Sequence, residues 1–441
     1  MVLLLMGSIF VNYVLGLLLT RDWRWKFCKT VALLAMVTWN FGLLYYYKYY
    51  AFTLSQVNWL AGLNITIPSI IQPLGISFFT FRTISYCLDV YWGTVSKKQN
   101  LLDVALYICF FPQVLMGPIT NYYEFYPQIN SRKFDTDEFL DGIKRIVIGL
   151  AKKLIIADNI GLIVDPIFAM GCDERTIGLA WLGIFCYLIQ LYYDFSGYSD
   201  IAIGIGKLLG FKTPTNFDYP FISKSVVEYW MRWHITLGTW LKVYLFTPLL
   251  MFCRNKNVAI GTSYVIALFG VWLFAGAWHG AGWNFICYGL YYFTFIVLER
   301  FYQDYRKTKR KKLGLKKRPN TPMENLAAHF YFFVVLIFGQ LLFRSQDMAH
   351  FWQYCSTMFG TCSNALWSPL SGFYLSQSFV LLLVGWFFAF PILQAVRDKL
   401  KCKHIDALVA IFSPVMYCLL FITAIAFAIT GTYQSFIYFQ F

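Results

Sequence analysis

The amino-acid sequence predicts an all-α protein that crosses a membrane many times. Of its 441 residues, 59% are hydrophobic and only 13% are charged, which is about half the charged share of a typical soluble domain. Such a chain cannot surround its core with a charged shell, whereas a surface that faces lipid needs none. The long apolar runs do not alternate with polar residues, so they favour helices over the strands of a membrane barrel.

Apolar segments recur along nearly the whole chain, at 2–19, 30–47, 69–91, 101–116, 143–156, 177–192, 201–209, 236–252, 259–277, 283–298, 326–342, 376–393 and 407–429. We expect about 10 to 12 true spans, because a span needs roughly 20 apolar residues. The shorter or charged segments are then re-entrant or buried behind other helices. Without an internal repeat or a soluble domain, the chain is interpreted as one transmembrane domain over residues 1–441. Its motif-rich core is 73–300, and its N-terminal helices at 1–66 are less sharply defined.

Lysine and arginine outnumber the acidic residues by 37 to 22, which gives a net charge of +15. On a soluble protein this surplus would suggest a nucleic acid partner. In a membrane protein, basic loops instead hold helix ends at the cytoplasmic face, and we expect no nucleic acid partner. The longest basic run, from Arg306 to Arg318, has nine Lys or Arg and no acid. This run and the loop from Arg21 to Lys29 are predicted to be cytoplasmic.

The N-terminal segment lacks the basic start and the small-residue cleavage site of a signal peptide. Residues 1–19 are interpreted as part of a spanning helix, in a chain that could begin within a longer parent protein. The 11 cysteines include no CxxC pair, and most lie in apolar runs. They are therefore expected to be small buried side chains, with no disulfide framework and no zinc or other metal site.

The most informative stretch is a polar segment between apolar walls, at residues 193–248. Polar and ionisable groups are costly at membrane depth, so they tend to mark a water-filled cavity or a reaction site. The alternative is a long polar loop at the surface. The density of aromatic residues, including Trp230, Trp233 and Trp240, favours an interfacial or re-entrant amphipathic helix. The polar residues of the segment include Asp194, Ser196, Ser199, Asp200, Asn216, Asp218, Glu228, Arg232 and His234.

Two of the five histidines lie in unusual surroundings. His279 follows an apolar run and is flanked by small residues in FGVWLFAGAWHGAGW, and such residues let helices or substrates approach the backbone closely. A hydrogen-bonded packing role explains this residue equally well when it is taken alone. His234 lies in EYWMRWHITL, where a helix would place it on one face with Trp230, and Glu228 on another face with Arg232. A salt-bridged interfacial helix is the alternative there. The remaining histidines are expected to be structural: His329, His350 and His404.

Histidines in polar pockets of a membrane domain are suited to proton transfer. Imidazole titrates near neutrality, so it can take a proton from an attacking hydroxyl and return it to a leaving group. Acyl transfer from a thioester to an alcohol needs this step, together with donors for the developing oxyanion. No nucleophile motif such as GxSxG accompanies the histidines, so direct attack by the acceptor hydroxyl is the simpler hypothesis. The glycines at 204–210 have the wrong spacing for a dinucleotide loop.

Several short motifs in a fixed order make the chain similar to a known family. They are PLGISFFTF (73–81), FFPQVLMGP (110–118), YDFSGYSDIAIG (193–204), NFDYPF (216–221), EYWMRWH (228–234), WHG (278–280) and FIYFQF (436–441). By these residues the chain resembles the membrane-bound O-acyltransferase family, in the branch of the alginate O-acetyltransferase membrane subunit.

The resemblance implies a ring of roughly a dozen membrane-spanning helices around a central funnel and a narrow tunnel. It implies that acetyl is moved from a cytoplasmic thioester, acetyl-CoA or another acyl thioester, across a bacterial plasma membrane to a cell-surface polysaccharide similar to alginate, without a bound cofactor. His279 would be the catalytic base, and His234 an assisting residue near the cytoplasmic entrance. The implied partners are membrane lipid, an extracytoplasmic transferase of the SGNH-hydrolase type, and a carrier protein as an alternative donor. Candidates for the tunnel wall are Asp194, Ser196, Asn216, Arg232, Trp233 and Trp278.

The chain departs from the family pattern in ways that weaken alginate itself as the acceptor. The stretch YGLYYF (288–293) lacks the histidine of a second motif that is common in the alginate branch. The stretch PLLMF (248–252) differs from the motif that this branch has after the amphipathic helix, and the N-terminal helices are shortened. One alternative is D-alanyl transfer to teichoic acid from an aminoacyl carrier protein. Another is a transporter or flippase without chemistry, which the missing internal symmetry disfavours. We expect His279→Ala to abolish acyl transfer and His234→Ala to impair it less.

Overall fold

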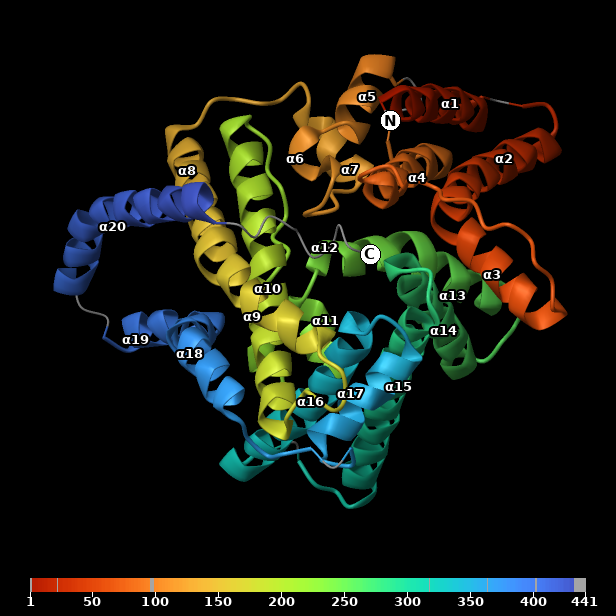
Figure 1. The fold of residues 1–441 in the computed structure, drawn as a ribbon. Coiled ribbons are helices and arrows are strands. Elements are labelled where there is room, and N and C mark those ends of the chain that lie inside the picture. Colours follow the sequence, from red (N-terminus) through yellow and green to blue (C-terminus); the bar gives the residue numbers. More distant parts are fainter. Residues whose placement is uncertain are drawn as a thin grey trace. The chain divides into compact units, whose positions relative to one another are not determined.

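The computed structural model describes residues 2–21, 23–95, 99–316, 318–362, 364–400 and 403–431, and most of these residues are helical (Figure 1). Within them, the only strand-like pairing is an isolated antiparallel bridge between Phe217 and Trp233. A polytopic all-α protein was predicted, and this prediction is confirmed. The C-terminal motif at 436–441 and the side chain of His404 lie outside the described part of the chain.

The elements follow one another as α1 (Val2–Thr20), α2 (Lys26–Leu44), η1 (Tyr45–Tyr49), α3 (Tyr50–Ala61), α4 (Ile76–Trp92), α5 (Leu101–Ile108), α6 (Phe111–Val114), α7 (Tyr122–Phe125), η2 (Tyr126–Gln128), α8 (Thr136–Leu150), η3 (Ala151–Ala157), α9 (Asp158–Ala169), α10 (Ile177–Leu208), η4 (Pro220–Ile222), α11 (Val226–Arg232), α12 (Ile235–Leu241), η5 (Lys242–Phe246), α13 (Thr247–Asn255), α14 (Ile260–His279), α15 (Trp283–Lys312), α16 (Pro322–Arg344), α17 (Met348–Met358), α18 (Pro369–Ala389), α19 (Ile392–Leu400) and α20 (Lys403–Thr430).

The chain forms two compact units. The first unit comprises Met1–Ile146, Ala202–Thr215 and Thr239–Pro248, and the second comprises Val147–Ile201, Asn216–Gly238 and Leu249–Phe441. Both histidines of interest and all six tunnel-wall candidates fall in the second unit. The site can therefore be described within that unit alone.

Eight helices in the described part are long and apolar enough to cross a membrane. They are Val2–Thr20, Phe27–Ala61, Ile177–Leu208, Ile235–Asn255, Ile260–His279, Pro322–Arg344, Pro369–Ala389 and Ile411–Thr430. The sequence predicted 10 to 12 spans. Some of the segments counted there, such as those that form α4 and α15, are not among these eight helices. The funnel and tunnel stay predictions.

Helix α10 differs from its prediction in an informative way. Two apolar segments separated by polar residues were expected at 177–192 and 201–209, but the structure has one continuous helix of 32 residues. Its acidic side chains are accommodated because neighbouring η3 supplies cations. Lys153 lies 2.7 Å from Asp194, and Lys152 lies 2.6 Å from Asp200. Ion pairing thus permits carboxylates in a helix that is otherwise apolar.

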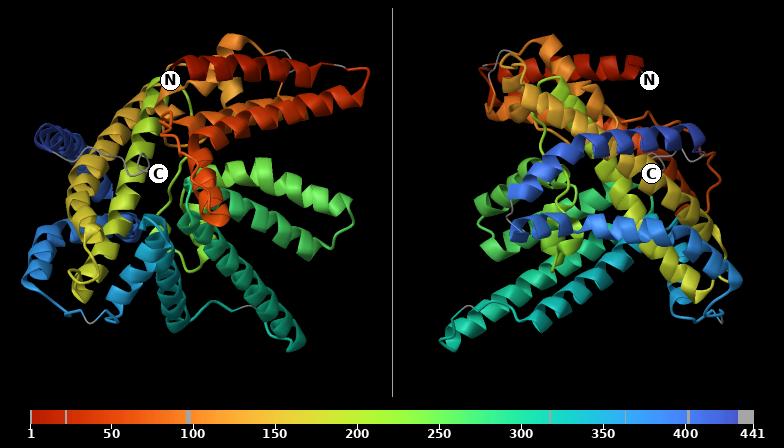
Figure 2. Two further views of the ribbon diagram at one scale, coloured as in Figure 1. Left: turned by 45° about the vertical axis from the view of Figure 1, so that its right-hand side comes forward. Right: turned by 90° about the vertical axis from the view of Figure 1, so that its left-hand side faces the viewer.

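Helices α14 and α15 pack backbone to backbone beside His279. A Cβ atom added to Gly276 would lie 2.5 Å from the carbonyl oxygen of Phe285, and one added to Gly289 would collide with the carbonyl oxygen of Trp272. Small residues at both positions are therefore required for this close approach. Helices α15 and α16 then form an antiparallel hairpin, whose tip carries the basic run (Figure 2).

A disulfide joins Cys172, between α9 and α10, to Cys362, between α17 and α18. The expectation that the cysteines form no disulfide is wrong at this pair. The two residues are 190 positions apart in the sequence, and no spacing pattern connects them. Only the fold, which brings the two loops together, reveals the pairing.

Candidate active site

Asn216 connects the end of α10 to the start of α12. Its Nδ2 donates a hydrogen bond to Ser199 Oγ over 3.1 Å, and its Oδ1 accepts one from Thr236 Oγ1 over 2.9 Å. The same Oδ1 lies 3.0 Å from Nδ1 of His234. Asn216 is 1% exposed and His234 is 2% exposed. A buried amide therefore fixes the orientation of the His234 ring.

These hydrogen bonds also determine the tautomer of His234. Because Nδ2 of Asn216 points to Ser199, its oxygen faces the imidazole, and an amide oxygen can only accept. Nδ1 of His234 must then carry the proton, and Nε2 keeps its lone pair. This Nε2 atom is buried and has no hydrogen-bond partner among the described residues. The site therefore presents an oriented, enclosed proton acceptor, which is the arrangement that general base catalysis or donor positioning requires.

The backbone at His234 is held in a conformation that L-residues rarely adopt. Its φ angle is +46°, in the left-handed region, which costs roughly 1–2 kcal/mol. The flanking segments are paired: Ile235 N donates to Asn216 O and Asp218 N donates to Arg232 O, each over 3.0 Å. Backbone strain that neighbouring bonds enforce in this way tends to cluster at functional sites.

The single helix predicted through 228–237 is therefore wrong at His234. Helix α11 ends at Arg232 and α12 begins at Ile235, so Trp230 and His234 do not share a helical face. The predicted pairing of Glu228 with Arg232 is confirmed, with 3.1 Å between Oε1 and Nε. Arg232 also pairs with Asp218 over 2.7 Å. Because its side chain is 26% exposed, Arg232 lies at the rim of the site.

Aromatic rings enclose the hydrogen-bonded pair. Phe195 of α10 contacts His234 edge to face, with 4.6 Å between ring centroids. Trp233 packs against Phe217 at 5.0 Å and stacks on Tyr229 at 5.5 Å. Apolar walls exclude water, which strengthens the bond between His234 and Asn216.

Two further candidates for the tunnel wall, Asp194 and Ser196, lie on α10 and have different surroundings. Asp194 is buried and pairs with Lys153, which also lies 2.6 Å from Asp158. This arrangement anchors α10 to the η3–α9 segment. Ser196 is buried, and its hydroxyl has no hydrogen-bond partner in the part of the chain that the structure describes. The described partners of the His234 ring are Asn216 and Phe195, the residue between Asp194 and Ser196 on α10.

His279 is the last residue of α14 and is 7% exposed. Its ring lies within a group of aromatic rings, with centroid distances of 4.7 Å to Trp278, 5.0 Å to Phe343 and 5.6 Å to Tyr288. Tyr288 belongs to the stretch in which the alginate branch commonly has a further histidine motif. The described partners of His279 differ from those of His234, which are Asn216 and Phe195.

The other two histidines whose side chains are described each lie beside a backbone carbonyl group. Nδ1 of His329 lies 3.0 Å from the carbonyl oxygen of Ser223, and Nε2 of His350 lies 3.0 Å from that of Phe168. Within the described residues, no three His, Cys, Asp or Glu side chains are grouped as metal ligands.

Glu299 is a functional candidate that the sequence did not reveal. This buried residue of α15 accepts hydrogen bonds from the backbone N–H groups of Val226 (2.6 Å) and Val227 (3.1 Å). It thereby fixes the first turn of α11, the helix that leads to His234. The only signal in the sequence was an acid directly after the apolar stretch 283–298, and it does not indicate which helix the carboxylate binds.

Replacing Glu299 with glutamine should destabilise the protein by about 1–3 kcal/mol, because an NH2 group then faces a buried N–H donor. Acyl transfer should also fall, because the first turn of α11, the helix that leads to His234, is then held less firmly. Thermal unfolding in nanodiscs and the rate of thioester cleavage measure the two effects. Asp304→Asn is the matched control, since Asp304 is exposed on the same helix. If the Glu299 variant is as stable as the control, the positioning role is wrong.

The fold and these sites define a polytopic helical membrane protein with buried histidines suited to proton transfer. The chain belongs to the membrane-bound O-acyltransferase family, whose model matches residues 94–313. That range contains both His234 and His279, and the resemblance seen in the motifs is confirmed.

Among curated relatives, the probable alginate O-acetylase AlgI of Azotobacter vinelandii is 36% identical over 71% of this chain and 60% of its own length. The protein of that name from Pseudomonas aeruginosa is 34% identical over 81% of this chain and 66% of its own length. A peptidoglycan O-acetyltransferase of Helicobacter pylori is 34% identical over 68% of the chain and 60% of its own length. A teichoic acid D-alanyltransferase of Bacillus subtilis is 29% identical. The chain thus spans 60–66% of the length of these O-acetylase relatives.

Proposed function

We propose that this chain is the membrane component of an O-acyltransferase, which moves an acetyl group from a cytoplasmic thioester across the membrane for O-acetylation of a cell-surface polysaccharide. The observation that carries the proposal is the buried His234, whose Nδ1 is held by Asn216 and whose Nε2 is left as a proton acceptor. The O-acetylase relatives support acetyl as the group, because the D-alanyltransferase is less similar. Membership of an acyltransferase family favours chemistry over transport alone.

In the proposed reaction, the acceptor oxygen forms a bond to the acyl carbon while the carbon–sulfur bond breaks. An imidazole nitrogen takes the proton from the acceptor hydroxyl and passes it to the thiolate that leaves. We assign this base to His279. His234 assists, since its Nε2 lone pair can accept a hydrogen bond from an amide N–H of the pantetheine arm, which CoA and carrier-protein donors share.

The proposed orientation places the basic run at 306–318 in the cytoplasm. Helix α16 begins just after that run and ends at Arg344, and the disulfide at Cys362 follows α17. Disulfides persist in oxidising compartments, and basic loops favour the cytoplasm. The basic run and the disulfide therefore agree: the start of α16 lies on the cytoplasmic side of a bacterial plasma membrane, and its end lies on the opposite side. The loop at 21–29 is proposed to be cytoplasmic on charge alone.

Labelling tests this orientation. In intact cells, an impermeant thiol reagent should modify Cys172 and Cys362 only after reduction, and should modify Lys311→Cys only after the membrane is opened. A Cys172→Ser/Cys362→Ser variant identifies the signal that belongs to the disulfide. Labelling of Lys311→Cys in sealed cells would contradict the orientation.

The acceptor side requires a partner in this proposal. Relatives are named for alginate and peptidoglycan acetylation, and an extracytoplasmic transferase of the SGNH-hydrolase type would complete transfer to the polymer. The surrounding membrane lipid is the other partner. Purified protein in nanodiscs, given radiolabelled acetyl-CoA and a hydroxyl acceptor, should release free CoA and label the acceptor. Absence of both products, with activity instead from a D-alanyl carrier protein, would replace acetyl by D-alanyl as the transferred group.

A further inference from the structure

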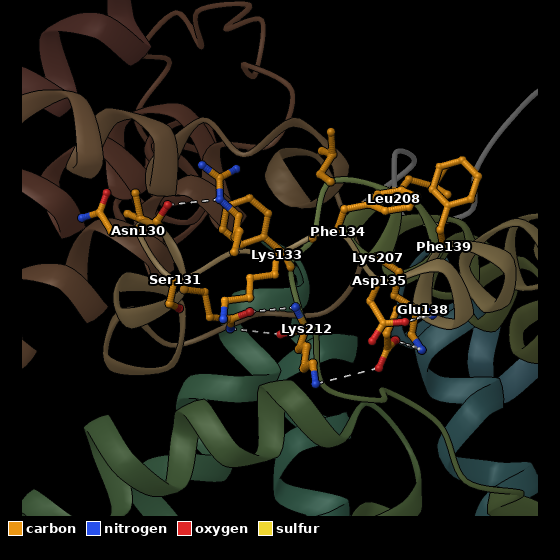
Figure 3. A pocket seen from close by; sticks show the side chains of 16 residues that line it. Asn130, Ser131, Lys133, Phe134, Asp135, Glu138, Phe139, Lys207, Leu208 and Lys212 are labelled. Carbon is orange, nitrogen blue, oxygen red and sulfur yellow. Dashed lines mark hydrogen bonds and ion pairs between the residues drawn. The ribbon is translucent and has the colours of Figure 1, made fainter.

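A polar groove lies in the first unit, and none of the residues that line it belongs to either histidine site. It has a volume of about 840 Å³ and is formed by residues 128–139, which lead into α8, and by residues 207–212 at the end of α10. In Figure 3, Lys212 lies between Asn130 and Ser131 on one side and Asp135 and Glu138 on the other. The groove is open, so a soluble ligand could reach it.

The charges of the groove do not cancel. Lys207 is neutralised by Glu138 at 2.7 Å and by Asp141 at 2.6 Å. Asp135 is engaged in capping α8, where it accepts a hydrogen bond from the backbone N–H of Asp137 over 2.9 Å. Nζ of Lys212 lies 3.9 Å from Oε1 of Glu138, a carboxylate that already pairs with Lys207. The side chain of Lys212 is 82% exposed.

Two further cations line the same groove. Arg132 uses Nε to donate to the carbonyl oxygen of Ile129 over 3.1 Å, and its guanidinium lies 4.6 Å above the ring of Phe211. The other two nitrogens of that guanidinium have no carboxylate partner among the described residues. Lys133 is exposed and has no ion-pair partner there either. The lining thus has four cations, with Lys207 and Lys212 beside Arg132 and Lys133, against the two acids Asp135 and Glu138. This excess of positive charge suits a ligand with several negative charges.

The groove is partly preorganised. Gln128 holds the backbone of Lys212 from both sides: its Oε1 accepts from Lys212 N over 2.7 Å, and its Nε2 donates to Lys212 O over 3.2 Å. Phe134 stands at the same groove, 78% exposed and 5.7 Å from Phe139. An exposed aromatic ring beside several cations is suited to stacking a planar base next to phosphates.

The compartment of the groove follows from α10. This helix has 32 residues, so it is about 48 Å long at 1.5 Å per residue, which exceeds the roughly 30 Å of the hydrocarbon core. Its first residue follows the disulfide cysteine Cys172 by five positions, and its last residue, Leu208, lines the groove. Because disulfides mark the oxidising side, the groove end of α10 faces the reducing cytoplasm, where thioester donors occur.

We propose that this groove binds the nucleotide end of acetyl-CoA, with its phosphates against Arg132, Lys133 and Lys212 and its adenine against Phe134. The proposal rests on the proposed acetyl transfer, and it adds a binding site for the donor that is separate from the two histidines. Binding there involves no covalent step. It should raise the affinity for CoA without changing the chemistry, and the affinity should fall as ionic strength rises.

The test is an Arg132→Gln/Lys133→Gln/Lys212→Gln variant in nanodiscs. Its Kd for CoA and its KM for acetyl-CoA should rise about tenfold, which is roughly 1.4 kcal/mol and within what three exposed charge contacts provide. Its kcat should not change. Acetyl-pantetheine, which lacks the nucleotide, should react equally well with both proteins. Lys307→Gln/Lys309→Gln/Arg310→Gln removes the same charge elsewhere and should leave the KM for acetyl-CoA unchanged.

The outcomes separate the groove from the proposed function. If the wild type cleaves acetyl-CoA and the groove variant has the same KM and Kd, the groove is not the nucleotide site and the proposed function stands. If both triple variants weaken CoA binding equally, general charge rather than this groove is responsible, and the proposal is overturned. If the wild type neither binds CoA nor cleaves acetyl-CoA, both the acetyl-CoA donor and the groove proposal are wrong.

Discussion

Replacing His279 with alanine is expected to abolish measurable acyl transfer, with a loss of about 10²–10⁴-fold, the range typical of a general base. The ring contacts Trp278, Phe343 and Tyr288 at the end of α14, and alanine removes the imidazole that would accept the proton. The measurement is free CoA released per minute from acetyl-CoA by protein in nanodiscs. Binding of CoA should persist, because the base does not hold the donor.

The control for this prediction is His350→Ala. His350 is also a partly buried histidine beside aromatic rings, but its Nε2 bonds a backbone carbonyl oxygen. It should keep most of the activity even if its stability falls. Size-exclusion profiles and thermal unfolding show whether each variant is folded. Comparable rates for folded His279→Ala and wild type would contradict the assignment of the base.

Replacing His234 with alanine is expected to reduce acyl transfer by about 10–100-fold, a smaller loss than at His279, since positioning contributes less here than the base itself. The KM for the donor should rise as well, because Nε2 no longer accepts a hydrogen bond from it. Steady-state kinetics with acetyl-CoA separate the two effects. An equal and complete loss in both histidine variants would instead indicate a coupled pair.

The unusual backbone at His234 provides an internal control. Glycine adopts a φ of +46° without the steric penalty, so His234→Gly should be more stable than His234→Ala by about 1 kcal/mol. Both variants lack the imidazole and should be equally slow. A glycine variant with restored activity would show that the alanine variant failed through misfolding rather than through loss of the ring.

The sequence predicted those features that depend on local composition. Long apolar runs became helices because a chain in lipid must satisfy its backbone hydrogen bonds internally. The small residues around His279 were associated with close approach, and Gly276 shows the reason, because it faces the backbone of α15. Gly289 faces the backbone of α14 in the same way, although no prediction was made for it. Glu228 and Arg232 pair as predicted because helical geometry alone places residues four apart on one face.

Features set by distant contacts could not be predicted. The helix expected through His234 breaks because segment 216–218 pairs with 232–235, and helix propensity does not include that partner. The polar interruption expected in α10 does not occur because Lys152 and Lys153 neutralise its acids from another element. The disulfide and the cap that Glu299 provides to α11 likewise join residues far apart in the sequence.

The central claim is that the buried histidines of this chain serve thioester cleavage and acyl transfer. Its most direct test compares free CoA released from acetyl-CoA by the wild type and by a His234→Ala/His279→Ala double variant, both in nanodiscs with a hydroxyl acceptor. The account predicts release by the wild type and none above background by the double variant, although both bind CoA. Equal release by the two folded proteins would contradict it.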